Sequence, residues 1–378
     1  MAYPPVAPIS GINQNLFPFK VNSEFYKEWV KITPLANLMG DQMNRPIYRH
    51  KLKDGEGLQF RVGRLNALDY KNPVVGLDQR RGATQQPKVD HDKVDTEFKS
   101  FPVELRGRDI VRLGTPISLP GAVRPQLVEV CQRNFNFDLF NAMTTDIYTN
   151  TATQKPSYDR IVTSGYSPNR GTYNGLAGLT AVLNGLTGVL YTQSGMNAAT
   201  LLAAKNLAER GGQSGTLEHA IKPAYMETRS GWPMNDYILL LNPSALPALL
   251  ADPLFLSTTM ARGTIVESDQ PQAIHGADYI GKFFGTHIYL CKDLMDYEVI
   301  SQDGTKKGAW NILMGAGALT VGWHEFPFIV SETDEIERIQ LFVSHEQRGQ
   351  KTLMFPGKAD PAQNIEQGIV HIFSQIAL

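Results

Sequence analysis

The stretch GAVRPQLVEVCQRNFNFDLFNAMTTDI, residues 121–147, carries the clearest pattern in the sequence. Its apolar residues recur at every fourth position, namely Leu127, Cys131, Phe135 and Leu139. This spacing places them on one face of an α-helix, and Pro125 is tolerated if it lies in the first turn. The sequence therefore predicts a helix over residues 121–147, about 40 Å long at 1.5 Å per residue. A helix of that length suits a spine on which other elements lie.

A long hairpin is predicted on the N-terminal side of this helix. Residues 47–52 and 58–62 are strand-like, and residues 94–111 alternate between apolar and polar side chains again. Residues 66–92 between them are polar and are interrupted by glycine and proline, so they offer little material for a core. We expect two strand regions that flank a long polar tip and reach away from the body.

A mixed module of strands and helices is predicted on the C-terminal side. Asn197 is a typical N-cap for a helix over residues 198–210, which Gly211 ends. Further elements are expected as strands at 237–241, 285–290 and 310–313, a capped helix at 244–250 and a short helix at 179–190. This alternation over residues 195–320 favours a compact α/β or α+β module.

The two ends of the chain are predicted to be extended. Residues 1–45 contain five prolines around short apolar pieces and read as an extended arm without a signal-peptide pattern. Residues 326–378 are mostly strand-like, at 328–330, 336–343 and 369–373, and are expected to close the core begun early in the chain. An arm with so little core of its own must lie along another part of the molecule or along a neighbour.

Composition excludes several classes of protein. The 378 residues are 42% hydrophobic and 19% charged, with a formal net charge of −1, so no basic field exists to drive nucleic-acid or membrane binding. Cys131 and Cys291 lie far apart in the sequence and rule out a disulfide framework or a cysteine zinc site. The apolar run 237–241 is much shorter than a membrane span. We expect a soluble protein from a reducing compartment.

No stretch of the sequence matches an enzyme motif in full. Residues 276–282 match the phosphate-binding pattern GxxxxGK, but Phe283 follows where a hydroxyl is required. Residues 90–92, Asp-His-Asp, are interpreted as a solvated charged turn rather than as metal ligands. The stretches at 212–216, 315–317 and 324–325 fail the patterns for a nucleophile elbow, a dinucleotide site and a metalloprotease, respectively. No catalytic, metal-binding or cofactor-binding residue is assigned, and no cofactor is expected.

Charge is distributed unevenly between two segments. Residues 51–81 hold seven basic against four acidic side chains, and residues 325–346 hold six acidic against one basic. The candidate contact residues are Arg61, Arg64, Arg80 and Arg81 on the basic side and Glu332, Asp334, Glu335 and Glu337 on the acidic side. They could pair between copies of the chain. Two solvated faces are an equally weighted alternative, because exposed ion pairs contribute only about 0–1 kcal/mol each.

Three stretches resemble a known family. They are DYILLLNPSALPALLADPLF at 236–255, GKFFGTHIYL at 281–290 and GAGAL at 315–319. They are similar to stretches of the major capsid proteins of tailed bacteriophages, which have the Johnson or Hong Kong ninety-seven fold, in the branch found in podophages related to phage N-four. The order of arm, hairpin, spine helix, mixed module and final strands resembles that fold over essentially the whole chain.

The resemblance implies an α+β fold and a division of the chain. Residues 1–45 would be the N-terminal arm, 46–110 the extended β-hairpin loop, 111–165 with 326–378 the peripheral domain, and 166–325 the axial domain. The implied function is self-assembly through hexamers and pentamers into an icosahedral shell around packaged double-stranded DNA, with no membrane partner.

Further partners implied by the resemblance are scaffold, portal and decoration proteins, with DNA bound only non-specifically. The implied location is the virion, after assembly in the host cytoplasm. Two alternatives remain at this point. One is an oligomeric α/β enzyme with an unrecognised active site in residues 166–325, and the other is a decoration or tail-tube protein, which the long helix argues against.

Overall fold

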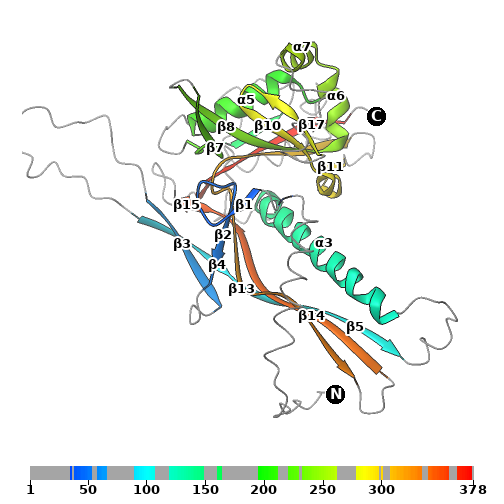
Figure 1. Ribbon diagram of the computed structural model, residues 1–378. Coiled ribbons are helices and arrows are strands. Elements are labelled where there is room, and N and C mark those ends of the chain that lie inside the picture. Colours follow the sequence, from blue (N-terminus) through cyan, green and yellow to red (C-terminus); the bar gives the residue numbers. More distant parts are fainter. Residues whose placement is uncertain are drawn as a thin grey trace, which may run out of the picture. The chain divides into compact units, whose positions relative to one another are not determined.

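The chain was analysed as a computed structural model (Figure 1). It describes residues 35, 38–52, 58–65, 89–106, 119–148, 160–163, 195–211, 220–229, 232–261, 278–297, 299–300, 307–333, 339–356 and 364–376. The chain divides into two compact units. The first contains residues 1–36, 96–136 and 323–348, and the second contains residues 37–95, 137–322 and 349–378.

The first unit is built on three neighbouring strands of a five-stranded sheet, whose order is β1-β2-β13-β14-β5. β5 (Glu97–Arg106) pairs antiparallel with β14 (Ile339–Thr352), so that Ile339 lies opposite Arg106 and Arg348 opposite Glu97. β13 (Leu319–Thr333) lies on the other side of β14 in the strand order. Residues 94–111 were expected to form the second leg of the hairpin, but β5 instead pairs with this distant strand.

The predicted spine helix is present as α3 (Leu119–Tyr148). Because it begins two residues earlier than expected, Pro125 lies in the second turn and not in the first. Residue 125 is exposed, so the helix continues past the proline on its solvent side. The four apolar side chains that predicted the helix are all buried, which confirms the interpretation of their spacing.

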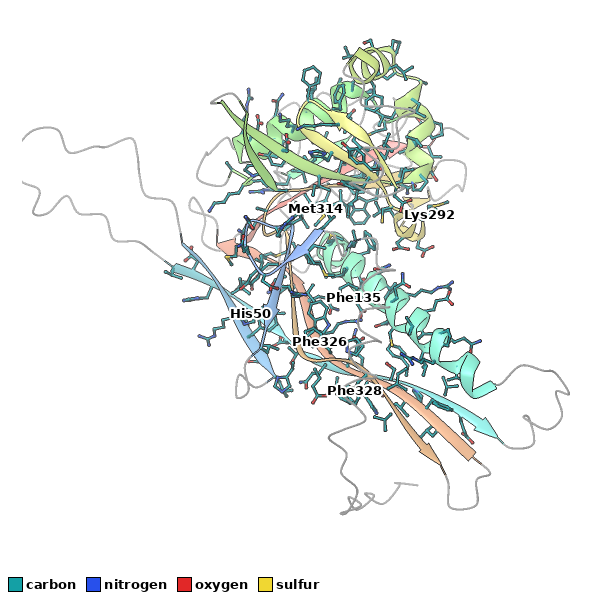
Figure 2. The ribbon with its side chains drawn as sticks, viewed as in Figure 1. His50, Phe135, Lys292, Met314, Phe326 and Phe328 are labelled. Carbon is teal, nitrogen blue, oxygen red and sulfur yellow. The ribbon has the colours of Figure 1, made fainter. Side chains whose placement is uncertain are left out.

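Helix α3 packs on the sheet of the first unit through apolar and polar contacts. The Phe135 ring, labelled in Figure 2, stacks on the Trp323 ring with centroids 5.6 Å apart. Beside it, Arg348 forms a fully buried ion pair with Glu346 at 2.6 Å and a 2.6 Å hydrogen bond to Asn134. A buried charged pair of this kind orients its elements more than it stabilises them.

The second unit contains an eight-stranded sheet. Six strands follow one another in the order β6-β17-β12-β8-β10-β9, while β7 pairs with β8 and β11 with β12. Their bounds are β6 (Ile161–Thr163), β7 (Tyr225–Arg229), β8 (Trp232–Leu241), β9 (Tyr279–Phe283), β10 (Thr286–Leu290), β11 (Val299–Ile300), β12 (Lys307–Met314) and β17 (Ile369–Gln375). The strands predicted at 237–241, 285–290 and 310–313 are therefore confirmed.

The C-terminal strand pairs with a strand of the module expected at 166–325. β17 pairs antiparallel with β12, from Gly308 opposite Gln375 to Met314 opposite Ile369. Residues 326–378 were expected in the peripheral domain, but residues 369–375 belong to the sheet of the module expected at 166–325. The reason is burial on both faces, since six of the seven residues of β17 are buried and such a run fits an interior strand.

Helices and short strands complete the second unit. α5 (Ala198–Arg210) begins at Asn197, whose side chain accepts a hydrogen bond from Thr200 N, and ends at Gly211 in the left-handed conformation. The other elements are the 3-10 helices η6 (Pro243–Ala245) and η7 (Lys292–Tyr297), the helices α6 (Leu246–Leu250) and α7 (Pro253–Ala261), and the short strands β1 (Met39–Gly40), β2 (Ile47–Lys51), β15 (Met354–Pro356) and β16 (Asn364–Glu366).

The core of this unit lies between α5 and the sheet. Alternate residues of β8 at 237, 239 and 241 share a cluster with Leu201 and Ala204 of α5. The short helix expected at 179–190 and most of the N-terminal arm lie outside the described residues. Within the described part of the chain, no helix combines the length and the apolar character needed to cross a membrane.

The cap of α5 gives a test of the fold. We expect Asn197→Ala to lower the free energy of unfolding by about 1 kcal/mol, because Thr200 N then loses its acceptor. Asn206→Ala, the same change at an exposed position inside the helix, should raise it by a few tenths of a kcal/mol. Urea unfolding of the unassembled chain measures both, and equal effects of the two substitutions would contradict the cap.

Candidate functional site

The base of the predicted hairpin is a regular pair of strands. β3 (Gln59–Leu65) and β4 (Val89–Asp95) pair antiparallel, from Gln59 opposite Asp95 to Leu65 opposite Val89. Residues 66–88, which join the two strands, lie outside the described residues. The hairpin that the sequence predicts is therefore confirmed at its base, with a second strand that begins inside the stretch expected to be loop.

An apolar cluster holds this base in place. Phe60, Val62 and Val94 from the hairpin are buried together with Leu353. The ring of His50 stacks on Phe60 with centroids 5.1 Å apart. Gly322 lies against the other side of the cluster, where an added Cβ would stand 2.5 Å from the Phe60 ring. A residue larger than glycine at position 322 would therefore displace the hairpin.

A polar contact anchors the same strands. Asp92 of β4 accepts a hydrogen bond from Lys351 Nζ at 2.6 Å and another from the backbone N–H of Met354 at 2.9 Å. Its side chain is only 10% exposed. The interpretation of residues 90–92 as a solvated turn was therefore wrong, because the alternation of β4 turns Asp92 inward, toward residues 351–354.

The structure describes some of the candidate contact residues and leaves the others outside the described part of the chain. Arg61 lies on β3 with an exposed side chain, opposite Lys93 of β4. Arg64 occupies the register position opposite Asp90, and Glu332 is the penultimate residue of β13, but the side chains of both are outside the description. The remaining candidates, Arg80, Arg81, Asp334, Glu335 and Glu337, lie outside the described residues. Their pairing stays a prediction.

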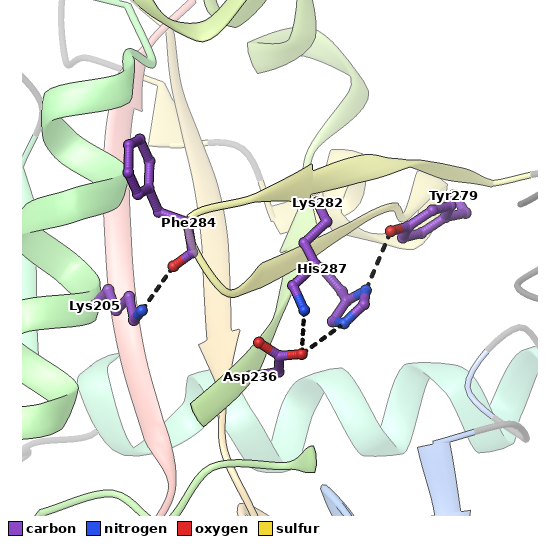
Figure 3. Close-up of polar contacts among 6 residues, drawn as sticks. All are labelled: Lys205, Asp236, Tyr279, Lys282, Phe284 and His287. Carbon is purple, nitrogen blue, oxygen red and sulfur yellow. Dashed lines mark hydrogen bonds and ion pairs between the residues drawn. The ribbon is translucent and has the colours of Figure 1, made fainter. Parts of the chain in front are cut away.

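A second polar cluster lies on the eight-stranded sheet and was missed by the sequence analysis (Figure 3). Asp236 of β8 accepts a hydrogen bond from Lys282 of β9 and lies 3.4 Å from Nε2 of His287 of β10. Nδ1 of His287 lies 3.1 Å from the hydroxyl of Tyr279. Lys282 and His287 meet because they are directly opposite each other in the β9–β10 pair.

Burial and hydrogen bonds together set the protonation of the groups in this cluster. Burial alone would raise the pKa of Asp236, but hydrogen bonds from His287 and Lys282 outweigh it and hold that pKa below its ordinary value. Burial, with a smaller effect of the Asp236 charge, raises the pKa of Tyr279 to about 12. A protonated Tyr279 can donate to Nδ1 of His287, which leaves Nε2–H to point at Asp236. The groups satisfy one another and link three strands.

The same strands explain why the GxxxxGK pattern is not a phosphate site. Gly281 lies inside β9, opposite Ile288 of β10, and not in a loop before a helix. Lys282 is engaged by Asp236, and the turn that follows is held by a 2.7 Å hydrogen bond from Lys205 to the Phe284 carbonyl. In the described part of the chain, no group of three or more histidine, cysteine, aspartate or glutamate residues could hold a metal ion.

Comparisons with known proteins identify the fold. No family model matches the chain, and no curated protein matches it. Among solved structures, the chain is similar to the capsid of cyanophage Pam1, with a TM-score of 0.68 and 15% identity over 92% of this chain and 93% of that one. It is also similar to the capsid of Ralstonia phage GP4, with a TM-score of 0.65 and 15% identity over 90% of each chain.

The head structure of Helicobacter pylori bacteriophage KHP40 is a third similar structure, with a TM-score of 0.57 and 12% identity over 99% of this chain and 95% of that one. These matches extend over nearly the full length of each chain. The chain therefore has the α+β fold of phage major capsid proteins, as the resemblance in its sequence implied.

The anchor of the hairpin gives one prediction. We expect Asp92→Ala to destabilise the chain by about 1–3 kcal/mol, because the Lys351 ammonium and the Met354 amide lose their shared acceptor. Amide hydrogen exchange in residues 89–95 should accelerate at the same time. Asp95→Ala is the matched control, since Asp95 is exposed and only faces Lys93, so it should cost less than about 1 kcal/mol. Unchanged exchange in Asp92→Ala would contradict the anchor.

The Asp236 cluster gives a prediction of pH dependence. An aspartate with a lowered pKa binds protons more weakly in the folded chain, so its stabilisation is present above the unfolded pKa, near 3.9, and is lost as the pH falls through the folded value. We expect Asp236→Asn to cost about 1–3 kcal/mol at pH 7. The difference from the wild-type chain should begin to shrink below about pH 4, where the aspartate of the unfolded chain takes up a proton, and should shrink further as the pH falls through the lowered folded pKa.

The exposed residue Asp296 provides the control, and Asp296→Asn should leave the free energy of unfolding unchanged at both pH values. Guanidinium unfolding at pH 7 and pH 3 measures these differences. A cost of Asp236→Asn that is the same at both pH values would show that the carboxylate charge does not stabilise the cluster.

Proposed function

We propose that this chain is the major capsid protein of a tailed bacteriophage and assembles with copies of itself into a closed shell. The observation that carries the proposal is the match over more than nine tenths of the chain to the Pam1 capsid chain, at a TM-score of 0.68. A fold shared over that length extends through most of the chain, in both of its compact units. The proposed shell is icosahedral, is built from hexamers and pentamers, and encloses double-stranded DNA.

The near-neutral charge of the chain supports this function. A net charge of −1 provides no general attraction for phosphates, so packaged DNA would touch the wall only weakly and non-specifically. The proposed location is the virion, after assembly in the host cytoplasm, and scaffold, portal and decoration proteins are the proposed further partners. Within the fold, we assign the chain to the branch of podophages related to phage N-four, on the stretches 236–255, 281–290 and 315–319.

The proposed division of the chain is the one that the resemblance implies. Residues 1–45 form the arm, 46–110 the extended loop, 111–165 with 326–378 the peripheral domain, and 166–325 the axial domain. The pairing of β17 with β12 joins the last segment of the peripheral domain to the sheet of the axial domain. The enzyme alternative in residues 166–325 has no support in the described part of that range. The titratable residues that gather there, around Asp236, are occupied with one another.

The hairpin is the proposed contact between subunits. Its base is fixed by the cluster around Phe60 and by Asp92, so the basic loop that follows Arg61 and Arg64 begins from a defined position. We propose that Arg80 and Arg81 of one subunit face the acidic residues Glu332, Asp334, Glu335 and Glu337 of a neighbour. Charges at the rim of an interface set orientation and association rate more than affinity.

Charge reversal tests this contact. We expect Arg80→Glu with Arg81→Glu to lower the yield of particles at least tenfold, while the circular dichroism spectrum and unfolding of the unassembled chain stay unchanged. Adding Glu335→Lys and Glu337→Lys to the same chain should restore particles, because the two faces again carry opposite charges. Particle yield is measured by sedimentation velocity and negative-stain electron microscopy.

The control is Lys222→Glu with Lys292→Glu, which changes the net charge equally at two exposed lysines outside both segments. It should form particles at the wild-type level. A normal yield from the Arg80 and Arg81 reversal would contradict the hairpin contact, and a loss that the compensating lysines do not repair would place the arginines against some other surface.

A further inference from the structure

The sheet of the first unit has one face that α3 does not cover. Along β14, Ser344, Glu346 and Arg348 are buried and contact the helix through Cys131 and Asn134. Side chains alternate along a strand, so residues 343, 345 and 347 lie on the opposite face. Their direct partners on β5 are Pro102, Ser100 and Phe98, which are exposed. We call this second surface the open face.

The open face carries a row of three rings, one from each strand. The His345 ring of β14 stacks on Phe98 of β5 with centroids 5.4 Å apart and contacts Phe328 of β13 with centroids 5.5 Å apart. Figure 2 labels Phe328 on its strand. Phe98 is 59% exposed, although the burial of a large apolar side chain is favourable. A row of this kind is typical of a surface that another segment covers.

His345 supplies a second, polar observation at the same place. Its Nδ1 atom is shielded from solvent and has no hydrogen-bond partner among the described residues. A buried polar atom without a hydrogen-bond partner destabilises the folded chain. An extended segment that crosses the row would bring backbone N–H and C=O groups to this atom, and it would bury Phe98 at the same time.

We propose that residues 1–34 of the same chain lie across the open face and form the second layer over this sheet. Leu35, the residue directly after this segment, has a side chain that is only 2% exposed, and it belongs to the first unit. The segment supplies apolar side chains to cover the rings, with Leu16, Phe17 and Phe19 as its densest group. Its prolines favour an extended backbone over a helix.

The length and the charge of residues 1–34 agree with their proposed position on the open face. The stretch from Phe19 to Leu35 spans sixteen residue-to-residue steps and reaches about 50 Å at 3.1 Å per step. A ten-residue strand such as β5 is about 34 Å long. Residues 1–34 contain three lysines and two glutamates, a net charge of +1, and residues 325–346 have six acidic side chains against one basic. The segment is therefore long enough and has the complementary sign.

Other occupants fit less well. A row of rings on a sheet can stack nucleic-acid bases, but the acidic excess of residues 325–346 would repel phosphates. We propose that the basic hairpin of a second copy contacts the acidic residues among 332–337, which precede β14. His345 lies eight residues beyond Glu337. The row of rings and these acidic residues can thus receive different segments.

Photo-crosslinking from the open face tests the proposal. The full chain is prepared with benzoylphenylalanine in place of Phe98, as an equal mixture of isotopically light and heavy subunits, and is irradiated both unassembled and as particles. We expect the captured peptides to come from residues 1–34 and to carry the same label as the site. The same photo-reactive residue at Leu254, which is 50% exposed on α7 of the second unit, should capture no peptide from residues 1–34.

Three outcomes would overturn the proposal: mixed-label peptides, peptides from residues 59–95, and the absence of captured peptides. The unassembled sample separates this proposal from the shell, because capture there does not require particles. As a second measurement, Phe17→Ser with Phe19→Ser should lower capture at least tenfold, while Asn13→Ser with Asn15→Ser in the same segment should leave it unchanged. Equal capture by both double variants would also contradict the assignment.

Discussion

The anchoring of the β3–β4 hairpin is the constraint on which the rest of the account depends. A two-stranded hairpin is only marginally stable by itself in water. Here it gains a buried cluster around Phe60 and the two hydrogen bonds of Asp92, so its strands are held by residues 351–354 from the other end of the chain. Residues 66–88 consequently start and end at fixed points. The contact with a neighbouring subunit that we propose for residues 66–88 therefore starts from defined ends.

The local elements could be predicted from the sequence because their signals are local. The four-residue spacing in α3, the Asn197 cap of α5 and the alternation in β3 each depend on neighbouring residues, and each was confirmed. Pairing between distant strands could not be predicted in this way. Nothing near β5 indicates that its partner is β14, and nothing near β17 indicates that it joins β12. Asp92 was misread for the same reason, since its partner Lys351 comes from the distant end of the chain.

The candidate functional residues show the same difference between local signals and long-range contacts. Charge counts alone pointed to Arg80 and Glu335, which lie outside the described residues, so their pairing between subunits stays a prediction. The cluster of Asp236, Lys282 and His287 needs the adjacent pairing of β8, β10 and β9, which no single stretch of sequence encodes. The one signal that could have found it was Lys282, singled out by a phosphate pattern whose context failed. The comparison with phage capsids then supplied what the sequence pattern had implied, a fold shared over the whole chain.

The most direct test of the central claim is the assembly state of the purified wild-type chain, expressed alone and together with its neighbouring virion proteins. Sedimentation velocity gives the size distribution, and negative-stain electron microscopy gives the shape of the products. The account predicts shells, tubes or rings of five and six subunits. A stable monomer or small dimer under all of these conditions would contradict it and would return attention to residues 166–325 as the place of an unrecognised active site.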